Sequence, residues 1–96
     1  MKPYHNKDMD FLYRGILSLQ TREECYAFFE DVCTIKELED MSGRLDVARL
    51  LVAGRSYQEV SKETGASTAT ISRVNRCLKY GSDGYITVLE RLDRMK

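Results

Sequence analysis

Residues 57–74 read YQEVSKETGASTATISRV, and the spacing of their small and apolar side chains predicts two short helices joined by a tight turn. Two helices that cross at roughly 90–120° need an apolar contact and a turn residue that tolerates positive φ. Val60 supplies the contact from the first helix, Ser61 is small enough for the crossing, and Gly65 suits the turn.

The second helix should return apolar side chains to the first. Ile71, Val74 and Leu78 recur at helical spacing and meet this need. Thr64 is the unusual residue, because an aliphatic side chain more often packs just before the glycine. The pattern predicts a helix-turn-helix over about residues 56–79, and an ordinary helical hairpin in a bundle is the alternative.

The outward positions of the predicted second helix carry short side chains first and basic ones later. Short side chains let a helix enter the major groove closely, where Thr and Ala can contact thymine methyl groups. Helix N-termini and hydroxyls hold phosphates, as do Arg and Lys. A solvated face with an ordinary N-cap at Ser67 is the alternative. The candidate DNA-binding residues are Ser67, Thr68, Ala69, Thr70, Ser72, Arg73, Arg76 and Lys79.

The distribution of charge supports a polyanionic partner. The whole chain is neutral, but residues 1–54 hold seven Lys and Arg against ten Asp and Glu, a net charge of −3. Residues 55–96 hold eight basic and five acidic residues, a net charge of +3. Residues 67–80 contain no acid at all. A local basic stretch on a neutral protein is typical of a nucleic-acid contact.

Helix signals recur along the chain, and the one proline is Pro3. The expected segments are a first helix near 9–18, segments starting at Thr21, Thr34, Ser42, Ser56 and Ser67, and a last amphipathic stretch from Tyr85 to Leu92. Thr21, Thr34 and Ser56 each precede a Glu by three residues, which is the capping-box pattern. The sequence predicts an all-α protein of six or seven short helices.

A chain of 96 residues forms one domain at most, and its core is small enough to make a lone monomer marginal. We expect an N-terminal flexible tail over residues 1–8 and a single helical DNA-binding domain over residues 9–96. No apolar run is long enough to cross a membrane, and the first residues lack a signal-peptide core. The expected location is therefore cytoplasmic.

No catalytic or metal site is predicted. The one histidine, His5, lies in the expected tail, and no nucleophile–base pair or Gly-rich phosphate loop is present. Cys25, Cys33 and Cys77 lack metal-ligand spacing and are expected to be free, mostly buried thiols. The protein is expected not to be an enzyme.

These residues also resemble a known family. Residues 65–73, GASTATISR, with Leu78 and Lys79 just beyond, are similar to the reading head of tryptophan repressor proteins. The chain as a whole looks most like the YerC/YecD-type branch of that superfamily. The resemblance is strong over residues 42–80 and looser over residues 9–41.

The resemblance implies a six-helix chain that interlocks with a second copy in a homodimer. The two recognition helices would then lie about one DNA turn (~34 Å) apart and read a palindromic operator in double-stranded DNA. The candidates for the intertwined core are Phe11, Leu12, Ile16, Phe28, Phe29, Val32, Ile35 and Leu38.

The resemblance also implies candidate effector-binding residues. In tryptophan-binding members two arginines flank the indole. Arg73 matches the second, and Arg44 matches the first if one residue is deleted near Gly54. A serine that holds the amino end corresponds to Cys77, a poorer polar partner. No cofactor is expected beyond a small-molecule corepressor, and tryptophan sensing is the less expected outcome.

Two functions remain open from the sequence. The first is a sequence-specific, dimeric DNA-binding transcriptional regulator, a repressor by resemblance. The second is a helix-turn-helix used as a protein-interaction module without DNA binding. Added salt separates them, because each neutralised phosphate releases counterions and makes DNA binding steeply salt-dependent.

Overall fold

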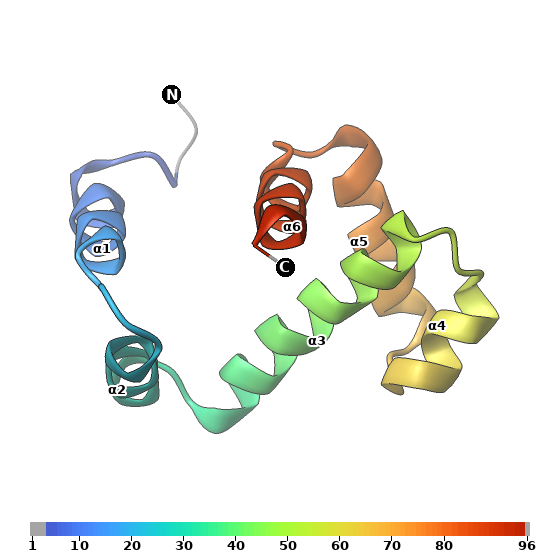
Figure 1. Ribbon diagram of the computed structural model, residues 1–96, viewed down its shortest axis with the longest axis horizontal. Helices are drawn as coiled ribbons and strands as arrows, with labels where there is room; N and C mark the ends of the chain where they lie inside the picture. The colour runs from blue at the N-terminus through green and yellow to red at the C-terminus, as the bar shows by residue number, and fades with distance from the viewer. Residues whose placement is uncertain (1–3, 96) are drawn as a thin grey trace. The chain divides into compact units, whose positions relative to one another are not determined.

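The computed structural model describes residues 4–95, which form an all-α fold of six helices (Figure 1). The helices are α1 (Lys7–Leu17), α2 (Arg22–Val32), α3 (Ile35–Val52), α4 (Tyr57–Thr64), α5 (Thr68–Tyr80) and α6 (Gly84–Arg94). The chain divides into two compact units between Leu38 and Glu39, inside α3. None of the described helices combines the length and apolar character needed to cross a membrane.

The helix starts follow the capping signals. Thr34 and Ser56 form complete capping boxes, in which each hydroxyl accepts a backbone N–H three residues on and the Glu there accepts the cap's own N–H. At Thr21 the box is altered, because Glu24 accepts the N–H of Gln20 instead. The prediction of helix starts at these residues is confirmed.

One predicted boundary was wrong. Ser42 does not cap a separate helix, because α3 continues through Ser42 and Gly43 as one helix of 18 residues. The reason lies in the apolar spacing. Leu38, Met41 and Leu45 follow one another at intervals of three and four, so a single helical stripe continues across Ser42.

The N-terminal end also differs from expectation. The helix α1 begins at Lys7, ahead of the predicted start at residue 9, and Asn6 caps it by accepting the N–H of Met9 at 2.9 Å. The predicted tail, residues 1–8, lies partly outside the described residues. The single domain over residues 9–96 stays a prediction.

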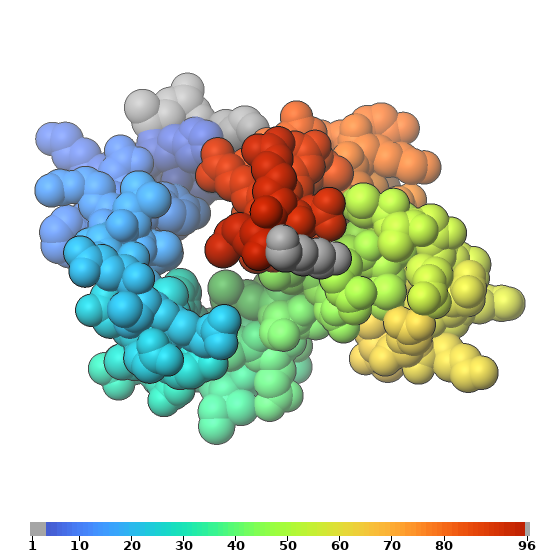
Figure 2. Space-filling view, viewed as in Figure 1, coloured from blue at the N-terminus to red at the C-terminus, as the bar shows by residue number. Residues whose placement is uncertain are grey.

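The buried core lies entirely in the second unit among the described residues. It consists of Val47, Ala48, Leu50, Val60, Ile71 and Val74. Leu78 of α5 and Leu89 of α6 pack against this cluster, and Figure 2 shows α4 (yellow) against the end of α3 (green). The burial of Val60, Ile71 and Val74 confirms that they point inward, and the same core also joins α4 and α5 to α3.

The first unit is different, because neither α1 nor α2 buries a residue. Phe11 is 75% exposed and Leu17 82% exposed, although both lie in a helix rich in apolar residues. The rings of Phe28 and Phe29 meet edge to face at 5.3 Å but lie only half-buried. Among residues 4–38, the apolar side chains therefore form no buried core of their own.

The Ser56 capping box makes stability pH-dependent. Hydrogen bonds from the backbone and hydroxyl of Ser56 hold the pKa of Glu59 below its ordinary value of 4.5. Because the pKa is lowered in the folded state, ionised Glu59 stabilises the folded protein above pH 4.5. This stabilisation is lost as the pH falls through the pKa of Glu59 in the folded state.

We expect the Glu59→Gln variant to unfold at a lower urea concentration than the wild type at pH 7. The difference between their urea midpoints should shrink below about pH 4.5. A gap that stayed constant from pH 7 to about pH 3 would contradict this assignment.

Candidate nucleic-acid interface

The helices α4 and α5 form the predicted helix-turn-helix (Figure 1). Gly65 ends α4 in the left-handed conformation, at φ 74°, which a side chain would strain. Ser67 then caps α5 by accepting the N–H of Thr70 at 3.1 Å. Val60 from α4 and Ile71 from α5 are both fully buried, so the core holds the two helices together.

The outward face of α5 brings most of the predicted DNA-binding residues together. Because three and four residues make about one helical turn, Ala69, Ser72 and Arg76 form one stripe opposite the buried Ile71 and Val74. The stripe borders an open hollow on the surface of α5, lined by Ala69, Ser72, Arg73, Asn75, Arg76, Lys79 and Tyr80.

The remaining predicted residues lie at the start of α5. Ser67 and Thr68 are exposed there, beside the first N–H groups of the helix. Thr70 is half-buried, and its hydroxyl accepts a hydrogen bond from Ser67 at 3.1 Å. Thr70 therefore lies toward the flank of α5 and outside the lining of the hollow.

The sequence reasoning missed Tyr80. The predicted helix-turn-helix ends at about residue 79, but α5 extends through Tyr80, which is 83% exposed. The signal was available, since Tyr80 follows Arg76 by four residues and so continues the same stripe.

The cations of this face are free of acidic partners. Arg73, Arg76 and Lys79 are exposed, and none forms an ion pair with another residue of the described chain, 4–95. The helix α5 itself contains no acid. By contrast, Arg55 in the loop before α4 lies 2.8 Å from Glu63 and 3.9 Å from Glu59. The hollow is thus a positive surface beside short side chains.

The candidate effector residues lie on two helices of the second unit. Arg44 is half-buried in α3 and has no ion-pair partner within residues 4–95. Arg73 and Cys77 are exposed and share the flank of α5 that also holds Thr70. Their part in binding an effector stays a prediction. The expectation of mostly buried cysteines was wrong, because Cys25 and Cys33 are only half-buried and Cys77 is exposed.

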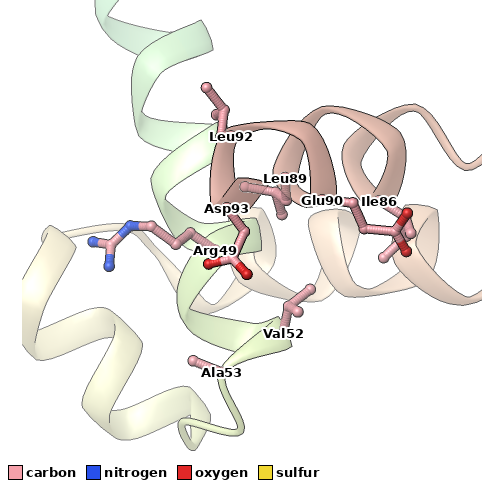
Figure 3. A pocket seen from close by; sticks show the side chains of 8 residues that line it. All are labelled: Arg49, Val52, Ala53, Ile86, Leu89, Glu90, Leu92 and Asp93. Carbon is pink, nitrogen blue, oxygen red and sulfur yellow. The ribbon is translucent and has the colours of Figure 1, made fainter. Parts of the chain in front are cut away.

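A second hollow lies between the end of α3 and α6 (Figure 3). Its lining is mainly apolar. Val52 at the end of α3 and Ala53 directly after it form one side, and Ile86, Leu89 and Leu92 of α6 form the other. Arg49, Glu90 and Asp93 supply its charged groups. Val52 and Leu92 remain about half exposed.

The fold and this face define a helix-turn-helix protein of the kind that presents one helix to a duplex. Residues 7–93 match the family described as Trp repressor protein, and the chain belongs to that family. The match extends over α1 to α6, so the whole described fold is the fold of the family.

Individual relatives agree with this assignment. The chain is 55% identical over 86 residues to the uncharacterized protein YerC of Bacillus subtilis (strain 168), covering 90% of this chain and 83% of YerC. A TrpR-like protein from Eubacterium eligens is 51% identical and superposes with a TM-score of 0.90, covering 94% of this chain and 93% of its own. A candidate Trp repressor from Staphylococcus aureus is 46% identical, with a TM-score of 0.89 and coverages of 92% and 88%. The expected resemblance and the all-α, Trp-repressor-like fold are confirmed.

Proposed function

We propose that this protein is a sequence-specific DNA-binding transcriptional repressor that acts as a homodimer on a palindromic operator. The observation that carries the proposal is the outward face of α5, where Arg73, Arg76 and Lys79 are exposed without acidic partners among residues 4–95. Ala69 and Ser72 lie beside them and leave room for close approach to a base edge.

Side-chain length distinguishes the residues of α5 that suit base contacts from those that suit phosphate contacts. Ala69 and Ser72 are short, so they suit contacts with thymine methyl groups and base edges in the major groove. Arg76 and Lys79 lie further along, where long cationic side chains reach phosphates. The exposed start of α5, with Thr68, adds N–H groups that favour a phosphate.

A homodimer accounts for the uncovered apolar surface of the chain. Soluble monomers rarely expose contiguous apolar patches, yet Phe11, Leu17 and Ile35 are each at least 75% exposed. The apolar hollow between α3 and α6 is a further uncovered surface. A second copy of the chain would cover these surfaces and, by symmetry, would present two α5 helices to a palindromic site.

Binding-site selection tests the proposal. The purified protein is given a random pool of DNA duplexes at about 100 mM salt, with and without tryptophan, and the bound sequences are read. Recovery of a palindrome with half-sites about one helical turn apart supports dimeric groove reading. Dependence on tryptophan would identify the effector, and substitution of Arg44, Arg73 and Cys77 would then test whether these residues bind it. Recovery of no sequence would favour the protein-interaction module.

Arg76→Ala is expected to weaken binding to every duplex by a similar factor, about tenfold or more in Kd. The reason is that one phosphate is no longer neutralised, whatever the sequence, which should also lower the slope of log K against log salt by about one. Fluorescence anisotropy at several salt concentrations measures both. Arg94→Ala is the control, since Arg94 lies in α6 beside Glu90. A loss confined to the selected operator would show that Arg76 reads bases instead.

A further inference from the structure

The turn between α4 and α5 is held by side-chain hydroxyls. Ser61 donates to the carbonyl oxygen of Ala66 at 2.9 Å. The N–H of Ala66 donates to the hydroxyl of Thr64 at 3.1 Å, and that hydroxyl donates in turn to the carbonyl of Val60 at 2.7 Å. The two peptide groups that flank Ala66 are therefore both fixed by residues of α4.

These hydrogen bonds are partly shielded from water. Ser61, Thr64 and Ala66 are all half-buried, and Ala66 packs against the hydrophobic core. A backbone N–H or C=O that loses its partner in such a place stays poorly solvated, which is more unfavourable than the bond itself is favourable. The two hydroxyls therefore restrict the conformation of the turn.

Ser61 and Thr64 hold Ala66 at the point where the chain passes from α4 to α5, so they influence the orientation of α5. Ala66 lies between Gly65, which has a left-handed backbone, and Ser67, which caps α5. The direction in which α5 leaves α4 depends on these few linking dihedral angles. At 1.5 Å per residue, Ser72 lies about 8 Å along α5 from its start at Ser67, so a tilt of about 10° moves it by roughly 1 Å relative to a base edge.

Such a tilt affects the two kinds of DNA contact differently. Hydrogen bonds to base edges need donor and acceptor within about 3.2 Å and good alignment, so a small shift breaks them. The attraction between a flexible Arg or Lys and a phosphate falls only gradually with distance. Loss of orientation should therefore reduce binding to the preferred sequence far more than binding to unrelated DNA.

We infer that Ser61 and Thr64 are positioning residues for sequence discrimination, which they provide by fixing Ala66 and hence the orientation of α5 on DNA. The inference rests on the proposed DNA-binding function and adds to it a role for residues that touch no base. It also explains why a polar Thr64 occupies a place where an aliphatic residue was expected. Its methyl keeps the shape of the aliphatic residue, and its hydroxyl holds two backbone groups.

Thr64→Val tests the inference, because it keeps the side-chain shape and removes the hydroxyl. The readouts are the ratio of affinities for the selected operator and a scrambled duplex, and the hydrogen-exchange rate of the Ala66 amide. We expect the ratio to fall about tenfold, binding to the scrambled duplex to change less than about twofold, and the Ala66 amide to exchange faster. Thr64→Ser should restore the ratio to within about threefold, since it retains the hydroxyl. Thr87→Val, the same change at an exposed position of α6, should behave as the wild type.

Each contrary outcome has a distinct meaning. A folded Thr64→Val with wild-type discrimination, or with equal losses on both duplexes, would overturn the positioning role. If Thr64→Val does not fold, Ser61→Ala replaces it in the test, because this change removes only the hydrogen bond to the Ala66 carbonyl. A Ser61→Ala variant with wild-type discrimination between the two duplexes would likewise overturn the positioning role. A wild type that prefers no duplex would overturn the proposed function itself, whereas a selective wild type with an indifferent Thr64→Val overturns the positioning role alone.

Discussion

We expect Phe11→Glu to disrupt the proposed homodimer and to leave a monomer that no longer binds its operator. Phe11 is 75% exposed in α1, so a charge there should do little harm within one chain. In a dimer, however, the ring would be buried against the second copy. Losing a buried Phe removes about 3–5 kcal/mol, and the substitution occurs once in each protomer. The association constant should fall by more than about a thousandfold.

Sedimentation at micromolar concentration, together with DNA binding, measures this effect. Tyr13→Glu is the matched control, because it lies two residues along α1 and therefore about 200° around the helix from Phe11. Tyr13 is not among the predicted intertwined-core residues. A Phe11→Glu protein that stayed dimeric and kept its operator affinity would place the dimer interface elsewhere.

The second large effect is expected at Ile71. Its side chain is fully buried and lies in the cluster that joins α5 to α3 and α4. Ile71→Ala removes three carbon atoms from this small core and leaves a cavity, which should lower the free energy of unfolding by about 2–5 kcal/mol. Since a domain of this size has only about 5–15 kcal/mol in total, the variant should be close to unfolding.

Urea unfolding followed by circular dichroism tests this expectation. Wild type and variant must be compared at the same protein concentration, because the proposed dimerisation would add to the apparent stability. Ser72→Ala provides the control, as Ser72 is the next residue of the same helix but is exposed. It should change the unfolding free energy by less than about 0.5 kcal/mol. An equally small effect of Ile71→Ala would show that the core tolerates the cavity.

The helix starts and the tight turn could be predicted because their causes are local. A capping box such as Ser56 with Glu59 joins residues only three positions apart, and its partners are therefore adjacent in the sequence. Gly65 likewise answers a local need for positive φ. The predicted start at Ser42 was wrong because Ser42 suits a cap locally, whereas the apolar stripe of Leu38, Met41 and Leu45 continues past it within α3.

Packing decided the features that no local pattern specifies. The folded chain decides which cations are available to bind a phosphate. Arg55 is neutralised by Glu63, eight residues away, whereas Arg76 has no acidic partner among residues 4–95. Phe11 is a second example, because its apolar character alone predicts burial, yet it is 75% exposed in the folded chain. Caps, turns and helix type depend on neighbours within about one helical turn, so the residue pattern specifies them. Ion pairing, burial and the orientation of α5 depend on which groups the folded chain brings together, and a linear pattern does not contain those distances.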